Sequence, residues 1–98
     1  MNFTIRWKDC KKSDAIANHL QNKMDNFQDF HFVEDDGKVE IVYYAKQNKY
    51  TCRMNVHVKT KGIIRAEANA YDVITSINDC ANKITDQLRR VKTQFKDR

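Results

Sequence analysis

The chain has 98 residues, 41% of them hydrophobic, which is enough for one domain with a modest core and too little for two. Its 18 lysines and arginines outnumber its 13 aspartates and glutamates, so the formal net charge is +5. This excess favours a polyanionic partner such as a nucleic acid, but a basic domain that is merely soluble would show the same charge.

The first residues alternate in polarity, with Phe3, Ile5 and Trp7 on one face, as a half-buried strand requires. Because the alternation leaves no continuous apolar run, we expect neither a signal peptide nor a membrane anchor, and a cytoplasmic location. A helix is predicted next, capped by Ser13 or Asp14 and running to about residue 27, since apolar residues then recur every three or four positions.

Residues 28–38 are predicted to form a loop, because the two aspartates and the glycine within residues 34–37 favour a turn. Three strands follow, at residues 39–44, 50–59 and 63–70, and short turns join them into an antiparallel meander. Their alternation predicts one apolar sheet face and one open face. The open face would carry Arg6, Lys8, Arg53, His57, Lys59 and Arg65.

From Asp72 to the C-terminus the chain has neither glycine nor proline, which predicts one long helix. One side of this helix is apolar and must be buried; it holds Val73, Ile77, Ala81, Ile84, Leu88, Val91 and Phe95. The other sides have only three aspartates, at positions 79, 86 and 97, and therefore predict a cationic ridge. The ridge residues are Lys83, Arg89, Arg90, Lys92, Lys96 and Arg98.

The order strand, helix, three strands, helix predicts an α/β (α+β) two-layer sandwich, β-α-β-β-β-α, with a four-stranded sheet and both helices on one face. Residues 1–98 would form this single domain. If the helices pack side by side, further lysines would join the ridge in one strip across the helical layer, namely Lys8, Lys11, Lys12 and Lys23. The alternative interpretation is an ordinary solvated helix surface.

The sequence shows no convincing trace of catalysis. Gly37 and Gly62 occupy expected turn positions and are too few for a phosphate-binding loop, and the three histidines and three cysteines lack metal-ligand spacing. We therefore expect no enzyme, cofactor, metal or small-molecule substrate. Trp7 and Tyr43 fall on the apolar faces and are expected in the core, which leaves Tyr44 and Tyr50 as candidates for exposure and base stacking.

Two stretches resemble the ribosome hibernation factors of the sigma-54 modulation protein family, which include the short hibernation promoting factor and the ribosome-associated inhibitor, or protein Y. Residues 13–27, with the pattern SDAI…L…KM…F, resemble the family's TEAL…K-F…L helix. Residues 65–88, with RAEA…D…SIN…KI…QL, resemble its x-A-S-A…D…A-I-D…K-L…Q-L passage. The resemblance covers essentially the whole chain.

The resemblance implies a fold similar to the double-stranded RNA-binding domain in its α-β-β-β-α part. It also implies binding to the small ribosomal subunit and its RNA, in the channel of messenger RNA and the A-site and P-site tRNAs, which would block translation and preserve idle ribosomes under stress or in stationary phase. The matching basic positions are Lys23, Lys83, Arg89 and Arg90, and Lys92 and Lys96 extend the same ridge. The bound form would be a monomer, with weak self-association through a strand edge left open.

The chain departs from the family pattern at Asp86, where arginine is common, and at Ala17 and Asn26, which replace basic residues. Fewer phosphate contacts would give weaker, more salt-sensitive binding or a shifted footprint. By comparison with long family members, we also expect no C-terminal dimerisation domain, and therefore no joining of two ribosomes by the protein's own tail.

Two alternatives stay open. The first is a free double-stranded-RNA-binding module, although that class usually has a lysine-rich start to its last helix and this helix begins Ala70-Tyr71-Asp72-Val73. The second is a small enzyme or protein-binding domain whose positive charge is incidental.

Overall fold

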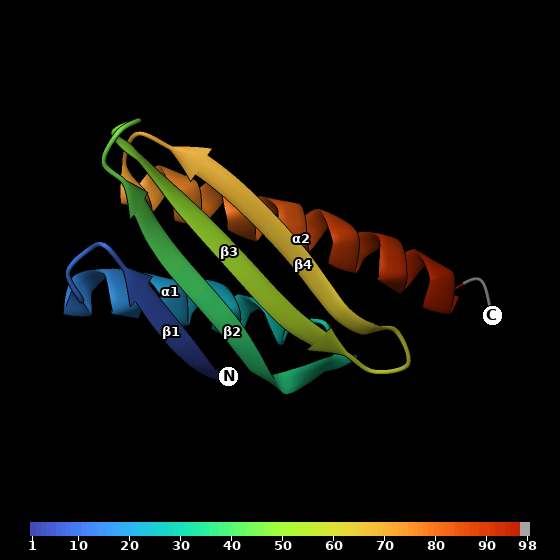
Figure 1. Cartoon of the computed structure of the whole chain (residues 1–98). Helices are drawn as coiled ribbons and strands as arrows, with labels where there is room; N and C mark the ends of the chain where they lie inside the picture. Colours follow the sequence, from blue (N-terminus) through green and yellow to red (C-terminus); the bar gives the residue numbers. More distant parts are fainter. Residues whose placement is uncertain (97–98) are drawn as a thin grey trace.

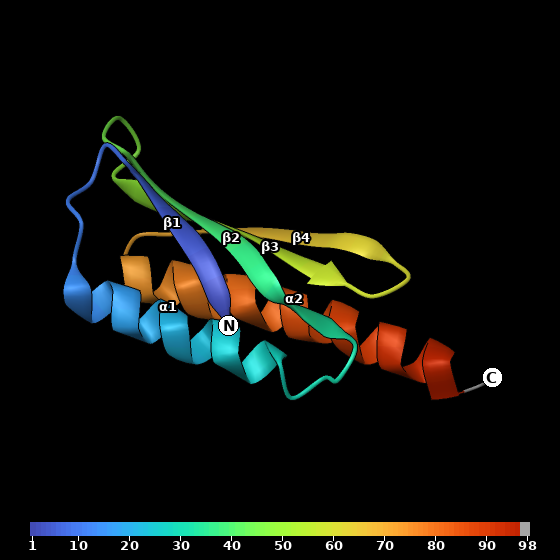
Figure 2. The same cartoon turned by 90° about the horizontal axis from the view of Figure 1, so that it is seen from below.

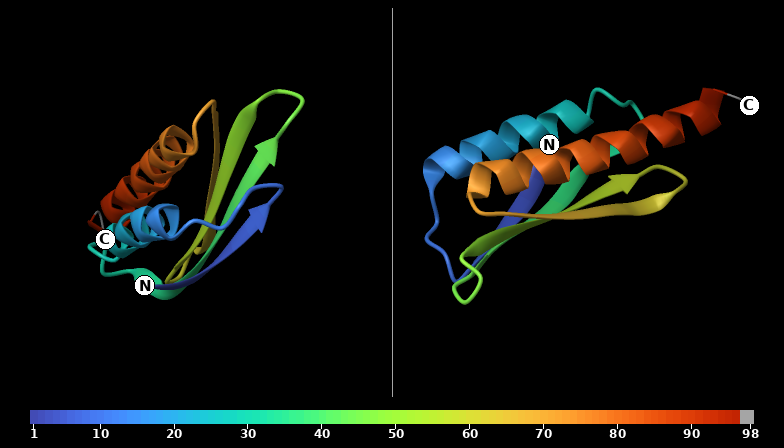
Figure 3. Two further views of the ribbon diagram at one scale, coloured as in Figure 1. Left: turned by 90° about the vertical axis from the view of Figure 1, so that its left-hand side faces the viewer. Right: turned by 90° about the horizontal axis from the view of Figure 1, so that it is seen from above.

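A computed structural model describes residues 1–96, with side chains through residue 94. Its elements in chain order are β1 (Asn2–Lys8), α1 (Asp14–Phe27), β2 (Val33–Tyr44), β3 (Lys49–Val58), β4 (Gly62–Ala70) and α2 (Val73–Lys96). The strands form one sheet in the order β1-β2-β3-β4, and both helices cover the same face of it (Figures 1 and 3). The predicted two-layer sandwich is confirmed.

The strand register aligns the apolar residues of all four strands on one face. Ile5 lies opposite Val39 in the parallel pair of β1 and β2, and Met54 lies opposite Val39 and Ala66 in the two antiparallel pairs. This row runs from one edge of the sheet to the other, so the face under the helices is continuous. The predicted antiparallel meander of β2, β3 and β4 is also confirmed.

The loop predicted over residues 28–38 is confirmed for residues 28–32 and wrong for residues 33–38, because β2 begins at Val33. The pairing is irregular here: Val33 pairs with Val58 and Gly37 with Val56, so β2 carries extra residues in a bulge. A Cβ atom on Gly37 would lie 2.7 Å from the Met24 Cε atom and 3.0 Å from a backbone oxygen of β3. Gly37 therefore allows close packing within a strand and does not form the expected turn.

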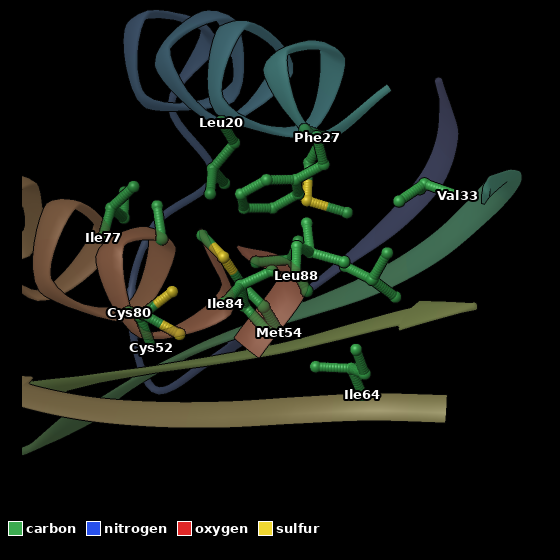
Figure 4. Close-up of a cluster of buried hydrophobic side chains, with 14 of the residues drawn as sticks. Leu20, Phe27, Val33, Cys52, Met54, Ile64, Ile77, Cys80, Ile84 and Leu88 are labelled. Atoms are coloured by element: carbon green, nitrogen blue, oxygen red, sulfur yellow. The ribbon is translucent and has the colours of Figure 1, made fainter. Parts of the chain in front are cut away.

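The core lies between the helices and the sheet (Figure 4). The side chains of Leu20 and Met24 from α1, Ile84 and Leu88 from α2, and Met54 from β3 are all fully buried. These are the apolar stripes predicted from helical and strand periodicity; the side chain of Phe95, the last of the α2 stripe, lies outside the described residues. Among the described helices, none has the length and apolar content needed to span a bilayer.

Ser13 begins α1 as its N-cap, with extended backbone and with its hydroxyl accepting a hydrogen bond from the Ile16 backbone N–H at 3.3 Å. Ser13→Ala should lower the free energy of unfolding by about 1 kcal/mol, because that N–H loses its partner. Urea unfolding followed by circular dichroism measures the change. Ser13→Asp keeps an acceptor at the cap and should stay near wild type; an equal loss in both variants would contradict the capping role.

Candidate nucleic-acid interface

The two helices lie side by side across the sheet (Figure 2), and one polar contact fixes how they face each other. The His19 Nε2 atom of α1 lies 2.7 Å from the Asn78 Oδ1 atom of α2. Helical spacing places Arg89 and Lys92 on the same flank of α2 as Asn78, and Lys23 one turn after His19 on α1. Arg89 and Lys92 are exposed and Lys23 is half-buried. Lys23 lies beside the seam between the helices, and Arg89 and Lys92 continue its line on the part of α2 that extends past the end of α1 (Figure 2). These three residues are called the seam cations below.

The opposite flank of α2 faces the free edge of β4. Lys83 Nζ donates to the Glu67 backbone oxygen at 2.8 Å, and Gln87 Nε2 donates to the Arg65 backbone oxygen at 2.9 Å. These side chains satisfy edge carbonyls that would otherwise be open to another strand. Arg90 shares this flank and lines, with Lys83 and Arg65, a shallow hollow of about 310 Å³.

Acidic residues lie between the two basic rows. Asp79 and Asp86 are exposed on the outer side of α2, and the Arg89 Nη1 atom is 3.8 Å from the Asp86 Oδ1 atom. This ion pair is largely in solvent, so it holds Arg89 only weakly. The described part of α2 therefore presents two separate rows of cations in place of the single predicted ridge.

The lysines that precede α1 do not all join the helical layer. Lys11 and Lys12 are exposed in the connection between β1 and α1, at the end of the layer where α1 begins. Lys8 is exposed too, but the alternation of β1 places it on the open face of the sheet. Lys96 ends α2, and its side chain lies outside the described residues, as does Arg98.

The open sheet face has most of the basic residues predicted for it, but several of them are paired, and Lys59 lies in the turn after β3. Arg53 contacts Glu40 at 2.7 Å and Glu67 at 3.1 Å, and hydrogen bonds with Tyr44 and Glu40 raise the pKa of its guanidinium above the ordinary value. His57 Nδ1 lies 2.7 Å from Asp36 Oδ2. This pairing reduces the positive charge that the sheet face offers to a partner.

Two of the three cysteines are enclosed in the core. Cys52 and Cys80 are fully buried next to each other (Figure 4), and the hydrogen bond with Cys80, followed by burial, raises the pKa of the Cys52 thiol. Among the residues that the structure describes, no group of three or more histidines, cysteines, aspartates or glutamates is arranged to hold a metal ion. The cysteines pack as small apolar residues.

The model of the sigma 54 modulation protein / S30EA ribosomal protein family matches residues 3–96. The chain belongs to this family. A curated relative, the ribosome hibernation promotion factor of Bacillus subtilis (strain 168), is 25% identical over 97 residues; the match covers 96% of this chain and 50% of the relative, so the chain spans about half of that protein's length.

Two solved structures share the fold of this family member. The protein Y N-terminal domain of Thermus thermophilus has a TM-score of 0.81 at 21% identity, covering 93% of this chain and 99% of that one. A ribosomal subunit interface protein from Coxiella burnetii has a TM-score of 0.81 at 17% identity, and the match covers 95% of this chain and 99% of that one. At these identities the likeness concerns the fold.

Sequence patterns missed the part that Arg65 plays in this family member. Arg65 was expected only on the open face, whereas it also borders the hollow beside Lys83 and Arg90. The signal that could have indicated this contact is the spacing of Lys83, Gln87 and Arg90 along one flank of α2, but only the packing of α2 on β4 tells which strand that flank meets.

Proposed function

We propose that this family member is a non-enzymatic translation regulator of bacteria that binds the small ribosomal subunit. It would occupy the channel of messenger RNA and the A-site and P-site tRNAs, block translation, and preserve idle ribosomes under stress or in stationary phase. The observation that carries the proposal is the family match over residues 3–96, which includes both helices and the whole sheet. The names of the Bacillus and Coxiella proteins support it.

The helical layer supplies the charge for such a partner. Phosphates of ribosomal RNA would contact the seam cations Lys23, Arg89 and Lys92, with Lys83 and Arg90 along the β4 flank and Lys11 and Lys12 at the end where α1 begins. Contacts to phosphate position a protein without reading sequence, as a fixed ribosomal site requires. The elongated shape, 48 × 23 × 18 Å, would exclude tRNA and messenger RNA sterically.

The proposal is tested by sucrose-gradient co-sedimentation of the purified protein with bacterial ribosomes at low and moderate salt, beside a naked RNA duplex. We expect the protein to migrate with the small subunit and with whole ribosomes, and to dissociate as salt rises, because phosphate contacts release counterions. Binding to the duplex should be much weaker at both salt concentrations.

Two results would contradict the proposal. Tight binding to naked duplex with no preference for ribosomes would identify a free double-stranded-RNA-binding module. Failure to bind either partner at low salt would identify the helical layer as an ordinary solvated surface.

A further inference from the structure

A pocket of about 300 Å³ opens at the end of the sandwich where α1 and α2 begin. It lies between the β1–α1 connection, the first turns of both helices, and the adjoining ends of β2 and β3. Its volume is at the lower end of the range for small-ligand sites. Its walls contain Trp7, Asp9, Cys10, Lys11, Ile16, Ile41, Tyr43, Tyr50 and Val73.

Three aromatic side chains line the pocket. Tyr43 and Tyr50 are cross-strand partners whose ring centroids are 4.9 Å apart with a tilt of 45°, and Trp7 on β1 adds a third ring. All three are half-buried, and fully buried Ile41 also lines the cavity. Such rings provide a face on which a flat ligand can stack.

The mouth of the pocket is polar. Lys11 and Asp9 are exposed at its rim, one cation and one carboxylate. The Cys10 thiol donates a hydrogen bond to the Ile41 backbone oxygen at 3.5 Å, and burial raises the pKa of this thiol, so it stays protonated and unreactive. The pocket therefore suits reversible binding and not covalent chemistry.

We propose that this pocket binds an unpaired nucleobase together with its phosphate. The base stacks on the aromatic walls, its N–H groups donate to Asp9, and the phosphate pairs with Lys11 at the rim. An uncharged aromatic ligand would make no use of the two charges at the rim, those of Lys11 and Asp9. A bare anion would make no use of the three aromatic rings. The inference goes beyond the proposed function and does not depend on it, because it concerns the protein without ribosomes.

Trp7 is the single tryptophan of the chain, so its fluorescence reports on this pocket alone. The experiment titrates the intact protein with guanosine monophosphate, excited at the red edge of the indole band where nucleotides absorb little. We expect saturable quenching. A single-stranded RNA tetranucleotide serves as the second ligand. If it binds more tightly than guanosine monophosphate, the natural ligand is a base within an RNA strand. If it binds equally or more weakly, the natural ligand is a free nucleotide.

Two variants and a matched control locate the site. Tyr50→Leu should weaken binding about tenfold or more, since a stacking face is lost, whereas Tyr71→Leu, at a tyrosine 72% exposed and outside the pocket, should change nothing. Lys11→Ala changes an exposed position that folding does not require. It should weaken the binding of guanosine monophosphate roughly threefold and leave the binding of guanosine, which has no phosphate, unchanged.

The proposal is overturned if no nucleotide quenches Trp7 saturably or if inorganic phosphate alone quenches it equally. It is also overturned if the Tyr50 and Tyr71 variants, both shown to be folded by circular dichroism, bind alike. None of these results bears on ribosome association, which is measured separately.

Discussion

Reversing the charge of the three seam cations, with Lys23→Glu, Arg89→Glu and Lys92→Glu combined, should abolish co-sedimentation with ribosomes while leaving the fold intact. Each of these cations is expected to contact a phosphate, and charge-assisted contacts are individually strong, so losing three should weaken binding by about a hundredfold or more. The salt dependence of the remaining binding should fall by about three units of slope.

The matched control reverses the same number of charges elsewhere. Lys46, Lys59 and Lys61 are exposed in the turns that join β2 to β3 and β3 to β4, away from the seam. Their combined change to glutamate alters the net charge equally and should reduce binding only slightly. Equal losses in the two triple variants would show that net charge, and not the helical layer, drives the association.

Ile84→Ala should destabilise the protein more than a change at any surface position. Ile84 is fully buried between α2 and the sheet, so the substitution removes buried apolar volume and leaves a cavity. The expected loss in the free energy of unfolding is about 2–5 kcal/mol. Denaturant unfolding at constant pH and salt measures it.

Ile63 provides the comparison for the same substitution, because it is 47% exposed on the open face at the start of β4. Ile63→Ala should change the free energy of unfolding by less than about 0.5 kcal/mol. A loss below about 1 kcal/mol for Ile84→Ala, or equal losses at both positions, would contradict the position of the core.

Periodicity and capping were enough to predict both helices and the antiparallel meander, but not the parallel pairing of β1 with β2. The α1 stripe containing Leu20 and Met24 is regular, and a capping serine precedes it, so local and tertiary preferences agree. The start of β2 was missed because residues 34–37 have the composition of a turn. A bulge and close packing at Gly37 override that local preference.

The candidate site was predictable as a list of residues but not as a surface. The pattern alone does not tell which flank of α2 meets α1, because that follows from a contact between His19 and Asn78 across 59 residues. Trp7 and Tyr43 were expected in the core. Both are half-buried: Trp7 packs against the edge of the core, and both rings also line an open pocket, which the sequence pattern did not predict.

Binding to small ribosomal subunits that are either vacant or filled with messenger RNA and tRNA tests the central claim most directly. The proposed site predicts that the protein binds vacant subunits and is excluded from filled ones, and that it displaces neither ligand when they are bound first in excess. Equal binding to vacant and filled subunits would contradict a site in the channel.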